Sequence, residues 1–116
     1  MASPREALQQ FLSVAKAQDF AAMGLVWGST DGPARSKFGR TELEQREFVM
    51  MKCLRHDRYQ VLSESPAVAG KRLFTVELGL RDLTASSTFT AIQGPRGRWY
   101  IEIFGIEDLQ KICTSM

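Results

Sequence analysis

The spacing of the apolar residues changes at Tyr59, and this change constrains the fold more than any other feature of the sequence. Before Tyr59 the apolar residues recur every three or four positions, which places them along one side of a helix. After Tyr59 they alternate with polar residues, as in a strand with one buried face. The sequence therefore predicts an α+β fold in which helices precede an antiparallel sheet. Its 116 residues, 44% of them hydrophobic, suffice for a single domain, 1–116, with one core.

Two helix starts near the N-terminus are marked by capping residues. Ser3, Pro4 and Glu6 combine an N-cap serine, a proline at the first helical position and a glutamate three residues after the cap. Asp19 can cap a second short helix, which must end before the turn-forming residues 28–33. We therefore expect two helices before this turn.

A third, longer helix is predicted to start at the sequence Thr-Glu-Leu-Glu, residues 41–44, which has the form of a second capping box. Apolar residues crowd more than one face of its later turns: Leu43, Phe48, Val49, Met50, Met51, Cys53 and Leu54. A helix that is apolar on several faces is usually surrounded by the core. We therefore expect the C-terminal half of this central helix to be buried on several sides.

Four strand-like runs follow, at residues 58–64, 72–80, 84–93 and 98–104, and a last helical turn is expected at 106–112. One face of the predicted sheet is apolar and should meet the helices: Phe74, Val76, Leu78, Leu80, Phe89, Ala91, Trp99, Ile101 and Ile103. The opposite face is mixed: Thr75, Glu77, Ser86, Thr88, Thr90, Tyr100, Glu102 and Phe104. Mixed faces of this kind are often buried against a partner, so we expect the outer sheet face to be covered by one.

This order of elements, with a strand that opens with Gly-Arg-Trp-Tyr-Ile at residues 97–101, resembles the NTF2-like, cystatin-like α+β superfamily. That superfamily includes ketosteroid isomerases and SnoaL-type cyclases, and many of its members have no known activity. The resemblance covers the chain from Ser3 to Cys113. It implies a cone in which the helices and the concave face of a curved four-stranded sheet enclose a pocket, and a dimer through the outer face.

The side chains expected to line such a pocket are mainly apolar and aromatic. We predict that the ligand-binding residues are Trp27, Met51, His56, Tyr59, Phe89 and Trp99, with Phe38 and Met50 as further candidates. The same residues describe a filled core equally well. The sequence thus favours a non-catalytic module that binds a small apolar ligand or a protein partner.

An enzyme of the SnoaL or ketosteroid-isomerase type is the alternative. Ketosteroid isomerases need an inward aspartate base with a tyrosine and a protonated acid as oxyanion donors, but every inward strand position here is apolar. The best remaining candidates are His56, Asp57 and Tyr59, where an imidazole next to a carboxylate can form an acid–base pair at the pocket mouth. The competing explanation is a basic cluster that stabilises the end of the long helix.

Composition excludes several classes of partner. The 15 basic and 13 acidic residues are interspersed, which gives a net charge of +2 and argues against a nucleic-acid surface. No apolar run is long enough to span a membrane, and two cysteines with one histidine cannot form a structural zinc site. We expect no metal and no cofactor.

Cys53 and Cys113 leave two alternatives open. They are either two independent small apolar residues or a disulfide that ties the C-terminal segment to the third helix. The disulfide is expected only if the protein is exported. The chain as written has the composition of a soluble protein, and its compartment stays open between the cytoplasm and an exported or lipid-anchored origin with a removed leader.

Overall fold

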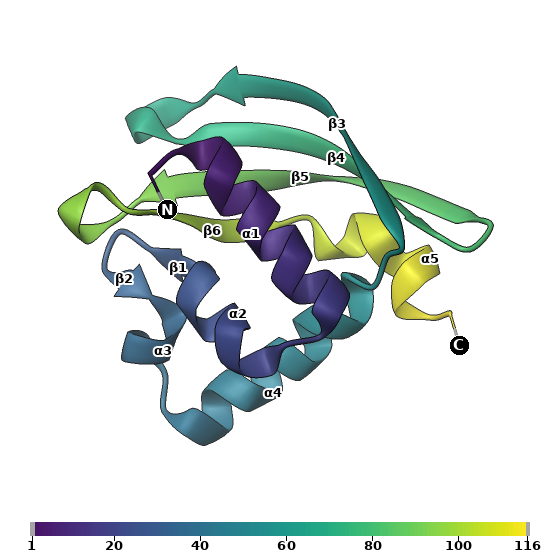
Figure 1. The fold of residues 1–116 in the computed structure, drawn as a ribbon, viewed down its shortest axis with the longest axis horizontal. Coiled ribbons are helices and arrows are strands. Elements are labelled where there is room, and N and C mark those ends of the chain that lie inside the picture. Colours follow the sequence, from purple (N-terminus) through teal and green to yellow (C-terminus); the bar gives the residue numbers. More distant parts are fainter. Residues whose placement is uncertain (1, 116) are drawn as a thin grey trace.

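The computed structural model describes residues 2–115 and has the predicted α+β architecture, with N-terminal helices and a curved, open antiparallel sheet (Figure 1). The helices are α1 (Pro4–Ala17), α2 (Phe20–Val26), α3 (Ala34–Lys37), α4 (Arg40–Cys53) and α5 (Gln110–Cys113). The strands are β1 (Gly28–Ser29), β2 (Gly32–Pro33), β3 (Arg58–Pro66), β4 (Arg72–Leu80), β5 (Leu83–Gln93) and β6 (Trp99–Phe104). Short 3₁₀ turns lie at Val68–Gly70, Pro95–Gly97 and Ile106–Leu109. The four predicted strands are confirmed to within two residues at each end.

The first two helix starts are confirmed by their caps. The Ser3 hydroxyl accepts a hydrogen bond from the Glu6 backbone N–H at 3.1 Å, and the Asp19 carboxylate accepts one from the Ala22 N–H at 3.1 Å. The predicted start of α4 is wrong. The helix begins at Arg40, because the carbonyl of Gly39 already accepts the first helical hydrogen bond, and no side chain caps it.

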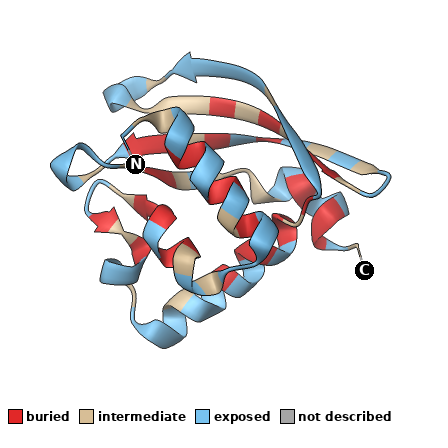
Figure 2. Ribbon diagram, viewed as in Figure 1, coloured by how far each residue is buried: buried red, intermediate tan, exposed pale blue. Residues whose placement is uncertain are grey.

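The expectation that the C-terminal half of α4 is buried on several sides is also wrong. Met50, Met51 and Cys53 are buried, but Phe48 is 67% exposed and Val49 is exposed beside it. The reason is that α4 packs against α2 and α5 and lies at the margin of the molecule, so its outer side faces solvent (Figures 1 and 2). Apolar residues on two faces of a helix do not ensure that both faces are covered.

The sheet has the order β3-β4-β5-β6, and every neighbouring pair is antiparallel. α1 crosses one face of the sheet and packs against β5 and β6 (Figure 1). Trp27 forms a parallel bridge with Ile101, so the chain leading into β1 lies along the outer side of β6. Within the described residues, β3 is therefore the open edge of the sheet.

A β-bulge in β6 overturns the predicted orientation of its last residues. Ala91 pairs with Ile101 but Thr90 pairs with Ile103, so Glu102 is an extra residue that reverses the faces after it. Ile103 was predicted to face the core and is 61% exposed.

Phe104 was predicted on the outer face and instead packs inward. Its ring centroid lies 5.5 Å from that of Phe89 and 6.2 Å from that of Phe11. The Trp27 indole N–H donates to the carbonyl of Glu102 at 3.2 Å, which satisfies a backbone group within the bulge.

Part of the mixed outer face is covered by the chain itself. Tyr100 was predicted on that face and is buried, because the β1–β2 turn lies against its ring. A Cβ atom on Gly28 would lie only 2.9 Å from Tyr100 Cγ, so this close approach requires glycine. The area of the outer face left for a partner is correspondingly smaller.

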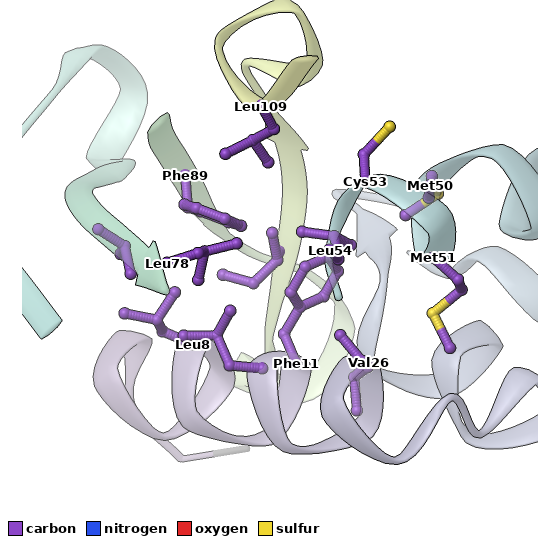
Figure 3. Close-up of a cluster of buried hydrophobic side chains, with 14 of the residues drawn as sticks. Leu8, Phe11, Val26, Met50, Met51, Cys53, Leu54, Leu78, Phe89 and Leu109 are labelled. Carbon is purple, nitrogen blue, oxygen red and sulfur yellow. The ribbon is translucent and has the colours of Figure 1, made fainter. Parts of the chain in front are cut away.

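The space between helices and sheet is filled with apolar side chains. Leu8 and Phe11 of α1 meet Leu78 and Phe89 of the sheet in this core (Figure 3). All four side chains are completely buried. Packing of this kind occupies the interior that the resemblance assigned to a pocket.

Of the two alternatives for the cysteines, the structure has the disulfide. Cys53 at the end of α4 is bonded to Cys113 at the end of α5, 60 positions along the chain. Arg55 reinforces this junction, since its guanidinium donates to the carbonyl oxygens of Ile112 at 2.6 Å and Ser115 at 2.9 Å. The C-terminal segment is thus held against α4 at two adjacent points.

Candidate functional site

The six residues predicted to bind a ligand occupy different environments. Met51 and Phe89 are completely buried in the core, and Trp27 and Trp99 are half-buried and pack against it. His56 and Tyr59 are in contact, with ring centroids 5.9 Å apart in an edge-on arrangement. Their role in binding stays a prediction.

The predicted acid–base pair of His56 and Asp57 is not assembled. The Asp57 carboxylate accepts hydrogen bonds from the Arg81 backbone N–H at 2.8 Å and from the Arg58 guanidinium at 2.7 Å. These bonds, the backbone one first, lower the pKa of Asp57. The carboxylate therefore holds the turn between β4 and β5 and pairs with Arg58.

His56 itself is a buried imidazole, 6% exposed. Its Nδ1 lies 2.8 Å from the Leu54 carbonyl oxygen, to which it donates in the neutral form, and Nε2 has no hydrogen-bond partner among the residues that the structure describes. Burial is the main cause that lowers the pKa of His56, and the nearby charge of Lys16 lowers it further. The imidazole is therefore mainly neutral near pH 7.

A half-open groove of about 600 Å³ lies between α2, α3 and α4. Phe20 and Ala21 of α2 form one wall. Arg35 of α3 and Phe38, which directly follows α3, form the second. The third consists of four residues of α4: Arg40, Leu43, Glu44 and Glu47. Sites for small organic molecules are commonly roughly 300–1,000 Å³ and mainly apolar with a few fixed polar groups. The groove has this size, but four of its eight lining residues are charged, so its wall is amphipathic.

Gly24 lets α2 approach α3 and α4 closely. A Cβ atom there would lie 3.2 Å from Leu43 Cδ2, 3.3 Å from Arg35 Cβ and 3.4 Å from Glu47 Oε2. These distances are at or inside ordinary van der Waals contact, so the backbone of Gly24 packs directly against α3 and α4. They also show that Arg35 and Glu47 approach the same point from different helices.

Glu47 is the most unusual polar residue in the groove. Its side chain is only 1% exposed, and its Oε2 has no hydrogen-bond partner among the described residues. Burial raises the pKa of Glu47 from 4.5 to about 7, with a further contribution in the same direction from the charge of Glu44. A carboxyl with this pKa is protonated about half the time near neutral pH and can donate a hydrogen bond.

The charged residues of the groove differ in their pairing. Arg40 donates to Glu44 at 3.2 Å in an exposed ion pair one turn along α4. Arg35 is exposed and has no ion-pair partner among residues 2–115. Within the described part of the chain, the groove therefore combines an arginine without an ion-pair partner and a buried carboxyl oxygen, Glu47 Oε2, without a hydrogen-bond partner.

Phe38 closes one side of the groove. Its ring stacks on Trp27 with centroids 5.6 Å apart, and the Arg46 guanidinium lies 4.6 Å from its centroid. Phe38 and Trp27 also line a smaller hollow of about 170 Å³ on the other side, next to Lys37 and Glu102. Phe38 was a further candidate from the sequence, and it connects the predicted Trp27 to the groove.

Glu47 and Arg35 were not predicted as site residues. A signal for Glu47 exists in the sequence, because it lies four residues after Leu43 and three before Met50. This spacing places it on the apolar side of α4. No comparable signal marks Arg35, since its position depends on how α3 packs against two other helices.

Among residues 2–115, no group of three or more His, Cys, Asp or Glu side chains is placed to hold a metal ion. No helix in the described part of the chain has the length and apolarity needed to cross a membrane.

The fold and the groove define an α+β protein whose helices pack on an open, curved sheet. A groove lined by apolar and charged residues lies between α2, α3 and α4. Comparisons with protein-family models, with curated proteins and with solved structures found no match.

Proposed function

We propose that this protein is a non-catalytic module that binds a small, mainly apolar ligand in the groove between α2, α3 and α4. The observation that carries this proposal is Glu47, whose buried Oε2 has no hydrogen-bond partner among residues 2–115 at the wall of the groove. An unpaired buried polar group costs roughly 1–3 kcal/mol. A ligand that supplies the missing hydrogen bond, once the carboxyl turns from Gly24 toward the groove, recovers part of this cost.

We also propose membership of the NTF2-like superfamily, on the basis of the element order and the curved open sheet. The resemblance implies a ligand site in the interior of the cone, whereas the proposed site lies between the helices and outside that interior. The packed core supports this location, because Phe11, Phe74 and Phe89 fill the space beneath the sheet.

The SnoaL or ketosteroid-isomerase alternative has weaker support. One observation favours it: beside Tyr59, His56 keeps a buried Nε2 for which residues 2–115 provide no hydrogen-bond partner. However, Asp57 is engaged with Arg58 and the Arg81 backbone instead of orienting the imidazole. A proton-transfer role requires a substrate within hydrogen-bond reach of a buried atom.

The proposed assembly is a homodimer through the outer sheet face. The residues Leu73, Thr90 and Ile103 form a row across β4, β5 and β6 on this face, and Ile103 is the most exposed of them. Light scattering over a concentration series tests the proposal with the wild type and Ile103→Lys. We expect a dimer that the substitution converts to a monomer, whereas a wild type that stays monomeric at high concentration refutes it.

Ligand binding is tested by fluorescence titration with the neutral apolar probe N-phenyl-1-naphthylamine. Ala21 is an exposed wall residue of the groove, so Ala21→Trp fills part of the hollow without disturbing the core. The matched control is Ala17→Trp, at an exposed position on α1 that does not line the groove. We expect saturable binding that Ala21→Trp abolishes and Ala17→Trp preserves. Equal binding by both variants would place the probe elsewhere and refute the proposed site.

A further inference from the structure

Two groups at the groove, a carboxyl oxygen and a guanidinium, have no hydrogen-bond or ion-pair partner among the described residues. The first can be an acid and the second is a cation. The Glu47 carboxyl is buried and has an unused oxygen, and the Arg35 guanidinium has no ion-pair partner among residues 2–115. Arg35 and Glu47 line the same groove from α3 and α4. Arg35 Cβ and Glu47 Oε2 lie 3.3 Å and 3.4 Å from a Cβ position at Gly24, so the two side chains start from the same part of the groove. A ligand that fills the groove can therefore contact both residues.

We infer that the ligand is a small monocarboxylate with an apolar chain, bound with its carboxylate between Arg35 and Glu47. The inference rests on the proposed function, because it names the ligand class of that same groove. A guanidinium presents paired donors that match the two oxygens of a carboxylate. The protonated Glu47 donates its O–H to one of these oxygens, so the two carboxyl groups share one proton.

The walls of the groove suit the rest of such a molecule. Phe20, Phe38 and Leu43 supply apolar surface, and Ala21 leaves room beside them. An apolar chain of medium length gains free energy in proportion to the surface it removes from water. A volume of about 600 Å³ accommodates a medium-chain fatty acid.

The charges around the groove favour a single negative charge on the ligand. α4 contributes Glu44 with its partner Arg40, and α3 contributes Arg35. The sequence of α2, Phe-Ala-Ala-Met-Gly-Leu-Val, has no charged residue. Glu44 repels a dianion such as a phosphate monoester more strongly than a monoanion, and Arg35 favours an anion over a neutral ligand.

Binding in this arrangement depends on the proton of Glu47. Below pH 7 the carboxyl is mainly neutral and donates to the ligand, and above pH 7 it is ionised and repels a carboxylate. If only the protonated form binds, the apparent Kd rises about tenfold between pH 6 and pH 8. Glu47→Gln is always neutral and keeps an N–H donor, so its binding should not depend on pH in this range.

The test is isothermal titration calorimetry with sodium octanoate and with 1-octanol, at pH 6 and pH 8. The two probes share an apolar chain, and only the first carries a carboxylate. The variants are Glu47→Gln, Arg35→Gln and Arg98→Gln, the last being an exposed arginine away from the groove that controls for the loss of one positive charge.

We expect octanoate to bind about tenfold more tightly at pH 6 than at pH 8, and octanol to show no such change. Arg35→Gln should weaken octanoate at pH 6 by about tenfold or more while Arg98→Gln does not, because a charge-assisted hydrogen bond is lost only in the first. Arg35→Gln should leave octanol binding unchanged.

Two results would overturn the inference in distinguishable ways. Equal binding of both probes, insensitive to pH and to Arg35→Gln, refutes the carboxylate site and leaves the apolar groove intact. Failure of both probes to bind, together with a lack of N-phenyl-1-naphthylamine binding, refutes the proposed function as well.

Discussion

Replacing Glu47 by glutamine should make the stability of this protein less dependent on pH. The raised pKa of Glu47 means that the folded protein holds this proton more tightly than the unfolded chain does. The unfolded chain therefore releases the proton first as the pH rises. Between the ordinary pKa of 4.5 and the folded value of about 7, the free energy of unfolding must fall with increasing pH.

The size of the effect follows from the two pKa values. At about 1.4 kcal/mol per pKa unit, a rise from 4.5 to about 7 corresponds to about 3 kcal/mol. This stabilisation is fully present below pH 4.5 and is lost as the pH rises through 7. Glu47→Gln removes the titration and keeps the shape of the side chain.

Urea unfolding of the wild type and Glu47→Gln between pH 4.5 and pH 8 measures the difference directly. Groups that titrate identically in both proteins, such as His56, cancel in the comparison. We expect the stability of the wild type relative to the variant to fall by about 3 kcal/mol across this range. The charge of Glu44 makes the second contribution to the raised pKa of Glu47. Glu44→Gln removes this charge, so it should move the midpoint of the fall to lower pH. A difference that stays constant with pH would refute a buried, proton-binding Glu47.

Two further predictions concern the framework of the fold. Gly28→Ala should destabilise the protein by about 2 kcal/mol or more in urea unfolding, because its Cβ would lie 2.5 Å from the Gly32 carbonyl oxygen. Gly39→Ala, where a Cβ meets nothing within 4 Å of the described residues, should cost less, about 1 kcal/mol for a poorer N-cap of α4, and equal losses would contradict the reasoning. Replacing both Cys53 and Cys113 by serine should cost about 4 kcal/mol for a 60-residue loop, and unchanged stability would show that the bond is not formed in solution.

The parts of the fold that were predictable depend on local chemistry. Ser3 and Asp19 cap their helices through neighbouring backbone N–H groups, so a few adjacent residues determine the result. The strands were predictable because alternation persists through each of them. The side chains of Ile103 and Phe104 were assigned to the wrong faces, because the bulge at Glu102 is set by pairing with β5 and is invisible in the sequence of β6.

The groove was not predictable, because it depends on the packing of three helices. The sequence shows Glu47 on the apolar side of α4 but not that α2 leaves its carboxyl without a hydrogen bond. The predicted site drew on aromatic and methionine residues that fill the core, such as Met51 and Phe89. Size and hydrophobicity do not distinguish a side chain that lines a pocket from one that fills it.

The most direct test of the groove is methyl NMR spectroscopy during a titration with octanoate at pH 6. Ala21 and Leu43 line the groove, and Leu78 and Ile101 are completely buried in the core beneath the sheet. A ligand between α2, α3 and α4 should shift the methyl resonances of Ala21 and Leu43 and leave those of Leu78 and Ile101 nearly unchanged. Shifts confined to Leu78 and Ile101 would instead place the ligand inside the cone, and no shift at any of the four would contradict ligand binding at the groove.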